Sequence, residues 1–183
     1  GQIPAEWQLR RNIAPTEPVA VVVDAVQRDV LWMRWGLIPS WAKDMSIGSR
    51  MFNARAETLA EKPSFRAALR QRRCLILADG FYEWQKPASG KGKSQPFHFR
   101  LQGGEPFMFA GLWESWRQPD GEDLLSCTLI TCAANETVAP IHERMPVILR
   151  GEQPWEWLRT PAQNLLAPLP TDALIVEKVS APR

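Results

Sequence analysis

Prolines are spread along the whole chain, and they limit the length of any helix in it. There are 16 prolines among 183 residues, and a proline inside a helix removes a backbone hydrogen bond and clashes with the preceding turn. Compact β-branched runs such as Val19–Val23 stand between them and favour strands. We therefore predict one α+β domain: a mostly antiparallel, β-barrel-like sheet with a few short helices.

Short apolar runs predict the individual strands, and few segments suit a helix. The expected strands are Pro18–Asp24, Asp29–Trp35, Cys74–Ala78, Phe81–Trp84, Pro96–Leu101, Pro106–Ala110, Ser126–Cys132, Pro146–Leu149 and Ala173–Val179. A helix is predicted over Glu57–Arg70, with its regular part beginning near Lys62 because proline is tolerated only in a first turn. Two further helices are expected over Pro154–Leu158 and Pro161–Leu166.

Charge and hydropathy exclude several classes of protein. The net charge of +2 neither requires nor excludes a local basic groove for nucleic acid. No apolar run approaches the ~18 residues of a membrane span, and Gly1–Arg11 is too mixed for a signal peptide. We therefore expect no membrane partner and a cytoplasmic location.

The cysteines and histidines indicate neither a disulfide framework nor a cofactor site. Cys74, Cys127 and Cys132 lie in apolar, strand-like runs, and three is an odd number, so core thiols are expected. Only His98 and His142 are present and no CxxC pair occurs. A zinc site is not expected, and we predict no metal or cofactor.

The clearest chemical signal is Glu83. Strand alternation places Phe81 and Glu83 on one face and Tyr82 and Trp84 on the other. A carboxyl group in apolar surroundings has a raised pKa, which suits proton transfer near neutral pH. The alternative is an exposed or ion-paired glutamate at a strand end.

Two other segments carry polar groups among apolar neighbours. The imidazole of His142 could move a proton or serve as a hydrogen-bonded structural group. Asn53 and Arg55 alternate on the strand-like run Met51–Ala56, so both can face one site. The alternatives are a turn-capping amide for Asn53 and a surface ion pair for Arg55.

Taken together, these segments resemble the SOS response-associated peptidase (SRAP) family. The matching motifs are N-A-R-A-E-T at 53–58, A-D-G-F-Y-E-W at 78–84 and I-H-E-R-M-P at 141–146, with further matches in R-N-I-A-P-T at 11–16, W-G-L-I-P-S-W-A-K-D at 35–44 and E-K-P-S-F-R at 61–66. The resemblance spans nearly the whole chain. It implies a β-barrel-like fold that carries a DNA groove.

The resemblance also implies an activity in the DNA-damage (SOS) response. The family binds single-stranded DNA and single-stranded/double-stranded junctions, and it captures abasic sites as a covalent DNA–protein crosslink. Its nucleophile is a cysteine exposed by autoproteolytic removal of the initiator Met. The cysteine amine forms a Schiff base with the deoxyribose aldehyde and the thiol closes a thiazolidine. The implied partner is abasic single-stranded DNA, bound by a monomer at the nucleoid.

Specific residues take roles by this resemblance. Asn53 matches the asparagine that positions the terminal cysteine, Glu83 the glutamate that activates its amine, and His142 the histidine that assists opening of the sugar ring.

The remaining matches concern DNA binding. Arg55 and Arg144 match arginines that hold phosphates, a role that suits guanidinium groups. Trp41 lies in the long loop Gly36–Arg50, and the resemblance places it against bases.

The start of the chain departs from the family pattern. The family opens Met-Cys-Gly-Arg, whereas this chain opens Gly1-Gln2-Ile3-Pro4, so we expect residues 1–183 to be an SRAP-like domain without the family's opening segment and nucleophile. Two alternatives stay open: a non-catalytic single-stranded nucleic-acid-binding module, and a Glu/His hydrolase that uses no DNA.

Overall fold

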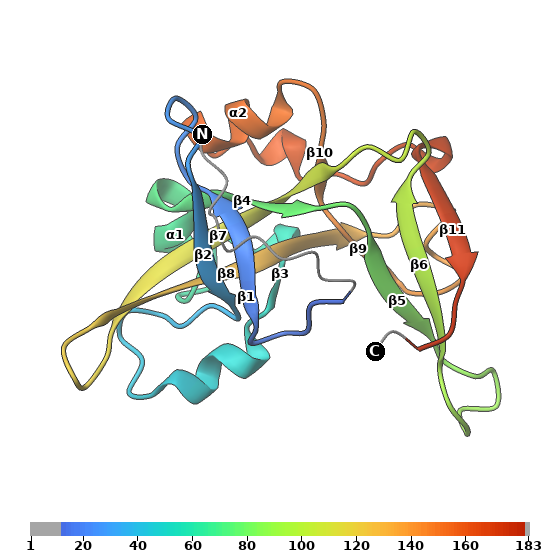
Figure 1. Cartoon of the computed structure of the whole chain (residues 1–183), viewed down its shortest axis with the longest axis horizontal. Coiled ribbons are helices and arrows are strands. Elements are labelled where there is room, and N and C mark those ends of the chain that lie inside the picture. Colours follow the sequence, from blue (N-terminus) through green and yellow to red (C-terminus); the bar gives the residue numbers. More distant parts are fainter. Residues whose placement is uncertain (1–11, 182–183) are drawn as a thin grey trace.

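The computed structural model describes residues 12–181, and its main feature is a sheet that closes on itself (Figure 1). The ring consists of β1 (Pro18–Val22), β2 (Val30–Trp35), β4 (Arg73–Ala78), β7 (Phe107–Arg117) and β8 (Asp123–Ala133). They pair in the order β7–β4–β1–β2–β8, and β8 pairs with β7 again. Closure leaves the ring without a free edge of its own.

Three short strands extend this sheet beside β7 and β8. β3 (Asn53–Arg55) runs parallel to β8, β9 (Arg144–Pro146) runs antiparallel to β8, and β10 (Ile148–Leu149) pairs with β7. Thr131 of β8 is the register partner of both Arg55 and Pro146. Strand β8 therefore joins the 53–58 and 141–146 segments.

A separate antiparallel sheet holds the third motif. It consists of β5 (Phe81–Gln85), β6 (Gln95–Leu101) and β11 (Leu174–Lys178), in the order β11–β6–β5, and lies at the right of Figure 1. Its inner face packs on the barrel because the ring of Phe81 stacks on Phe99 and meets Phe109 of β7 edge to face. The aromatic contacts of Tyr82 are with Trp84 and His98 instead. The predicted alternation of β5 is thus confirmed.

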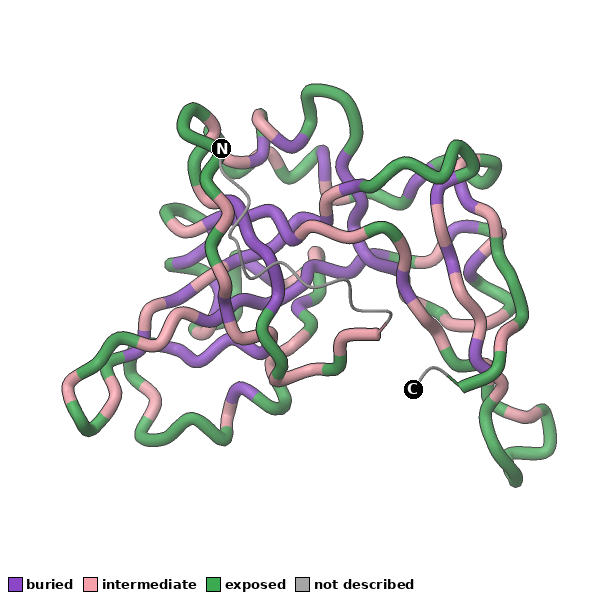
Figure 2. The backbone as a smooth tube through the Cα atoms, in the orientation of Figure 1, coloured by how far each residue is buried: buried purple, intermediate pink, exposed green. Residues whose placement is uncertain are grey.

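Most of the core lies inside the closed sheet, where Figure 2 shows the backbone buried. Two short helices cover it, α1 (Arg66–Gln71) and α2 (Gln153–Arg159). Arg73 ties their carboxyl ends together: its buried guanidinium donates to two carbonyl oxygens of each helix, at 2.7 to 3.0 Å. A cation in this position also suits the negative ends of the two helices.

The fold class is confirmed, and so are the predicted strands except Pro146–Leu149, which is divided between β9, paired with β8, and β10, paired with β7. Strands β7 and β8 extend beyond the predicted runs. The predicted helix Glu57–Arg70 is correct only in its last part: residues 56–58 form a 3-10 turn, η2, and α1 begins at Arg66 rather than near Lys62. The turn that follows η2 ends at Lys62, because Pro63 has no N–H with which to continue it. The helix predicted over Pro161–Leu166 is only the 3-10 turn η3 (Gln163–Leu165).

Three further observations concern helix length, metal-binding groups and the cysteines. None of the helices in residues 12–181 is long and apolar enough to cross a membrane. Within the same residues, no group of three or more His, Cys, Asp or Glu side chains is placed to hold a metal ion. All three cysteines are free and buried, as expected of core thiols. The prediction about the opening residues falls outside the described part of the chain.

Candidate functional site

The long loop that carries Trp41 is closed at its base by two glycines. Gly36 has a φ of +135°, and a Cβ on it would lie 2.5 Å from the carbonyl oxygen of Gly48. A Cβ on Gly48 would in turn lie 2.6 Å from the oxygen of Gly36. Only glycine lets the two backbones cross this closely. The loop ends in a 3-10 helix, η1 (Met45–Arg50), whose first turn is capped by the side chain of Asp44.

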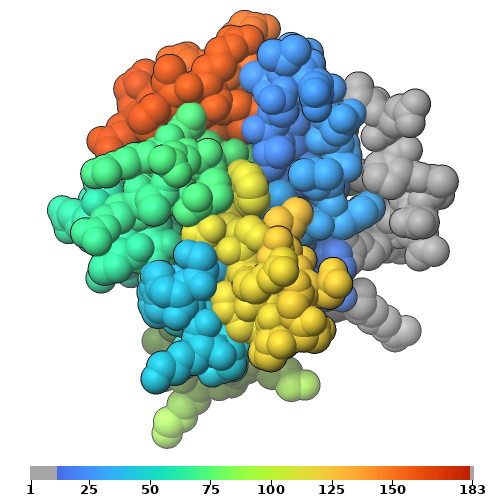
Figure 3. Space-filling view, turned by 90° about the vertical axis from the view of Figure 1, so that its left-hand side faces the viewer, coloured from blue at the N-terminus to red at the C-terminus, as the bar shows by residue number. Residues whose placement is uncertain are grey.

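Trp41 stands exposed on this anchored loop. The backbone N–H of Ile38 donates to Ser126 Oγ at 2.8 Å, and the indole N–H of Trp116 donates to the oxygen of Ala42 at 2.8 Å. Figure 3 shows the light-blue loop beside the yellow β7–β8 hairpin. Trp41 is nevertheless 60% exposed. A large ring is therefore presented to solvent from a fixed backbone, as a stacking surface requires.

Strand β3 presents Asn53 and Arg55 on one face. Both side chains are exposed, while Ala54 between them is 2% exposed and belongs to the core. The predicted alternation of this segment is therefore correct. The positive charge of Arg55 helps to lower the pKa of the Glu57 carboxyl, which places Arg55 near that group.

Glu83 is half-buried on the inner face of β5. Burial raises the pKa of its carboxyl, and a positive charge on His142 opposes this rise. The backbone of Trp84 also donates a hydrogen bond that lowers the pKa of this carboxyl. Glu83 and His142, from separate elements, are therefore close enough to interact electrostatically.

The turn that carries His142 is tied to strand β5. The side-chain amide of Gln85 donates to the carbonyl oxygen of Pro140 at 2.8 Å, and the backbone N–H groups of Ile141 and His142 both donate to Val138. This turn positions the imidazole beside Glu83. The Nδ1 atom of His142 lies 3.1 Å from the backbone nitrogen of Arg144 and 3.0 Å from its carbonyl oxygen.

Arg144 is held by an ion pair that crosses β8. Its Nη1 and Nη2 atoms donate to the two carboxylate oxygens of Glu57 at 2.7 and 2.8 Å, and Nη2 also donates to the Thr131 carbonyl oxygen at 2.7 Å. The Arg144 side chain is 17% exposed and that of Glu57 52% exposed. The hydrogen bond from Arg144 lowers the pKa of Glu57, and the same bond raises the pKa of Arg144.

The structure brings together some of the predicted site residues. Glu83 and His142 interact, and Arg144 is joined to His142 through its backbone. Within residues 12–181, no hydrogen bond joins Asn53 to Glu83 or His142, so convergence of all three on one cleft stays a prediction. Sequence reasoning assigned no role to Glu57, although it lies inside the quoted N-A-R-A-E-T motif.

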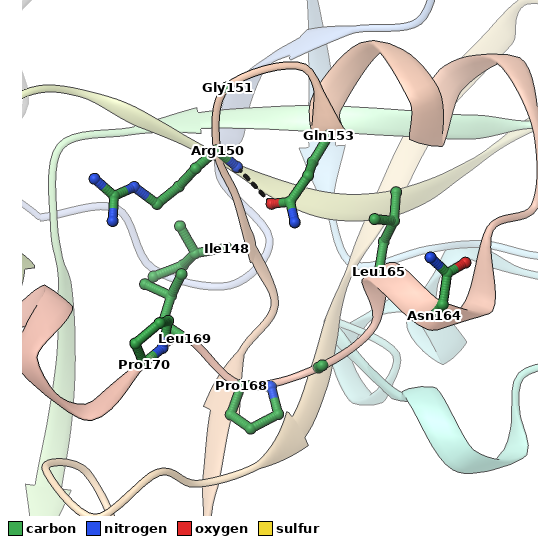
Figure 4. Close-up of a pocket in the computed structure, with 10 residues that line it drawn as sticks. Ile148, Arg150, Gly151, Gln153, Asn164, Leu165, Pro168, Leu169 and Pro170 are labelled. Carbon is green, nitrogen blue, oxygen red and sulfur yellow. Dashed lines mark hydrogen bonds between the residues drawn. The ribbon is translucent and has the colours of Figure 1, made fainter.

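A surface pocket of about 550 Å³ lies elsewhere, beside β10 and the start of α2 (Figure 4). Ile148, Leu165 and Leu169 contribute apolar lining, and the backbone of Arg150 is bonded to the side chain of Gln153. None of the six predicted site residues lines it. It therefore does not bear on the chemistry described above.

Comparison with known proteins decides the family. The protein-family description "SOS response associated peptidase (SRAP)" matches residues 2–182. The chain belongs to the SRAP family. A relative of this SRAP chain in Bacillus subtilis (strain 168), the abasic site processing protein YoqW, is 44% identical over 183 residues, which cover 96% of this chain and 81% of YoqW. The abasic site processing protein HMCES of Rattus norvegicus is 36% identical over 158 residues, covering 71% of this chain and 44% of HMCES.

Solved structures agree with the fold of this SRAP chain. A crystal structure of a protein from Bordetella bronchiseptica superposes with a TM-score of 0.83 at 30% identity, over 96% of this chain and 90% of that one. A second, from Bacteroides thetaiotaomicron, has a TM-score of 0.82 at 27% identity, over 91% and 75% of the two chains. The β-barrel-like arrangement is therefore the fold shared by these proteins.

Proposed function

We propose that this domain processes abasic sites in single-stranded DNA and, in a chain that begins with the family's terminal cysteine, captures them as a covalent crosslink. The observation that carries the proposal is the pairing of a half-buried Glu83, whose pKa is raised by burial, with the imidazole of His142. A carboxyl group whose pKa is raised by burial, beside an imidazole, suits the proton transfers in a reaction of an aldehyde with an amine. The names of the relatives YoqW and HMCES support the choice of substrate.

The chemistry has three stages, and His142 and Glu83 each assist one of the first two. An abasic deoxyribose is mostly a closed ring, and proton transfer through His142 opens it to the free aldehyde. The amine of an N-terminal cysteine attacks the aldehyde carbon, Glu83 accepts the protons that the amine loses and passes them to the former aldehyde oxygen, and this oxygen leaves as water to give a Schiff base. The cysteine sulfur then adds to the C=N carbon and its proton passes to the nitrogen, which closes the thiazolidine. In this scheme Asn53 positions the cysteine.

DNA is held beside this pair by charge and stacking. Arg55 is exposed on β3 and meets phosphate, Arg144 offers the N–H of Nη1 that Glu57 leaves unused, and Trp41 stacks on a base. The DNA is single-stranded or a single-stranded/double-stranded junction. We further propose that the protein acts as a monomer on nucleoid DNA in the DNA-damage response, and that its peptidase activity is the autoprocessing that exposes the cysteine.

The deciding experiment uses two chains that differ in one atom. Each is extended to match the family opening, one beginning Cys-Gly-Arg and the other Ser-Gly-Arg. Both are incubated with an abasic single-stranded oligonucleotide and run on a denaturing gel, with and without a reductant. We expect a heat-stable adduct without reductant only from the cysteine chain, because serine cannot close a thiazolidine.

A second candidate function is a non-catalytic module that binds single-stranded nucleic acid. It is favoured by the exposure of Trp41 and Arg55, whose contacts with DNA would not need proton transfer. Tight, salt-dependent binding by the cysteine chain without any adduct would leave this candidate in place and remove the first.

A further inference from the structure

The backbone of Arg144 faces the ring of His142 with both a donor and an acceptor. In an extended strand the N–H and C=O of one residue point to the same side. At Arg144, the first residue of β9, these two groups lie 3.1 and 3.0 Å from Nδ1 of His142. An unprotonated Nδ1 accepts from the N–H, and a protonated Nδ1 donates to the carbonyl oxygen.

This arrangement keeps Nδ1 engaged in every protonation state of the ring. The other ring nitrogen, Nε2, is then the atom left to exchange a proton with Glu83 or with a sugar oxygen. The ring need not turn between the states, so proton transfer requires little rearrangement of the site. This advantage depends on the backbone of Arg144 staying in place.

Hydrogen bonds to Glu57 and Thr131 fix the side chain of Arg144, although it lies near the surface. The two-point bond with Glu57 fixes the plane of the guanidinium, since both Nη atoms are used. The further bond of Nη2 to Thr131 attaches the same group to β8. Neither oxygen of Glu57 bonds any other side chain of residues 12–181.

We propose that Glu57 is a positioning residue for His142. It fixes the guanidinium of Arg144, and so the Arg144 backbone that engages Nδ1, and it leaves Nε2 as the site of proton transfer. The inference rests on the proposed function, because the role of Nε2 is defined by the abasic-site reaction.

Other charges lie near His142 or near the ion pair, and the test must separate their effects from that of the two-point bond between Glu57 and Arg144. Glu83 interacts with His142 from β5, Glu143 interacts with the charge of Arg144 from the same turn, and Arg55 interacts with Glu57 from β3. Glu143 is the matched control: it is exposed and interacts with the charge of Arg144, but its carboxylate makes no hydrogen bond to the guanidinium within the described residues. Glu57→Gln and Glu143→Gln therefore remove the same charge, and only the first weakens the two-point bond to the guanidinium of Arg144.

The first readout is hydrogen exchange of the Arg144 amide, followed by NMR on the chain beginning Cys-Gly-Arg. In Glu57→Gln we expect this amide to exchange about tenfold faster, while core amides of the barrel exchange as in the parent chain. In Glu143→Gln the Arg144 amide should be unchanged. Equal exchange at Arg144 in the parent chain and in Glu57→Gln would overturn the proposal, as would a general acceleration across the barrel.

The second readout is the rate of adduct formation with abasic single-stranded DNA at saturating protein. Glu57→Gln should react about tenfold more slowly or worse, and Glu143→Gln should react within about twofold of the parent chain. Equal slowing by both variants would show an effect of charge alone and overturn the proposal. Absence of adduct in the parent chain would remove the proposed function instead, while the amide exchange would still decide the role of Glu57.

Discussion

A positive charge on His142 opposes the rise that burial causes in the pKa of Glu83, although the two residues belong to different parts of the fold. Glu83 lies on β5 of the three-stranded sheet. His142 lies on the turn whose Pro140 carbonyl oxygen accepts a hydrogen bond from Gln85 of β5. Burial favours the neutral carboxyl and is the larger effect, and the charge on His142 favours the carboxylate. A carboxyl group with a raised pKa is a stronger base than an ordinary glutamate, which suits the acceptance of a proton.

Replacing Glu83 by glutamine should slow adduct formation by about 100-fold or more, because the variant cannot accept the amine proton. The size of the side chain is retained, so the midpoint of urea unfolding should change little. The rate is measured with the chain beginning Cys-Gly-Arg. Glu61→Gln, at an exposed position, is the control and should react normally; a normal rate in Glu83→Gln would contradict the assigned role.

The pH dependence of the same reaction should report the raised pKa of Glu83. The proposed base must be ionised, so the rate falls as pH drops through that pKa, at a midpoint above the value of about 4.3 for an ordinary glutamate. The terminal amine titrates as well, but it is common to all variants. The parent rate should therefore fall more steeply with decreasing pH than that of Glu83→Gln. Parallel profiles would argue against proton transfer by Glu83.

Arg55→Ala removes an exposed cation and should weaken binding to single-stranded DNA of every sequence. Loss of one phosphate contact should also reduce the slope of log affinity against log salt by about 0.7. Fluorescence anisotropy over a series of salt concentrations measures both quantities. Arg70→Ala removes an exposed arginine from α1 and is expected to leave the slope unchanged; equal effects of the two variants would indicate only a response to net charge.

Trp41→Ala should lower the affinity for single-stranded DNA by about 1–3 kcal/mol, the contribution of one stacked base. The exposed ring adds little to the core, so thermal stability should be nearly that of the parent chain. Trp41→Phe keeps an aromatic face and should retain most of the affinity. If the alanine and phenylalanine variants bind equally, Trp41 does not stack on DNA.

Gly36→Ala should destabilise the fold by about 2–4 kcal/mol, since a side chain there meets both an unfavourable φ and the oxygen of Gly48. Gly104→Ala is the control, because Gly104 also has a positive φ, +74°, but a Cβ would contact nothing within 4 Å. It should lose only about 1 kcal/mol. Urea unfolding measures both, and equal losses would show that the crossing of the two backbones is not a tight one.

The sequence alone determined the local structure and the types of groups in the candidate site. Alternation along Phe81–Trp84 and along Asn53–Arg55 correctly assigned each side chain to a face, because the period of a strand is a local property. The motifs were also sufficient to predict the family. The helix predicted over Glu57–Arg70 failed where helical periodicity met a proline, since the pattern of apolar residues does not record where hydrogen bonding stops.

Only the tertiary structure decided which of these groups meet. The interaction of Glu83 with His142 depends on the packing of the three-stranded sheet against the barrel. The ion pair of Glu57 with Arg144 forms because β3 and β9 both pair with β8. Such contacts join residues far apart in the chain, and their strength comes from burial and orientation. A sequence shows that a glutamate and an arginine are present; the register of two strands along a third makes them partners.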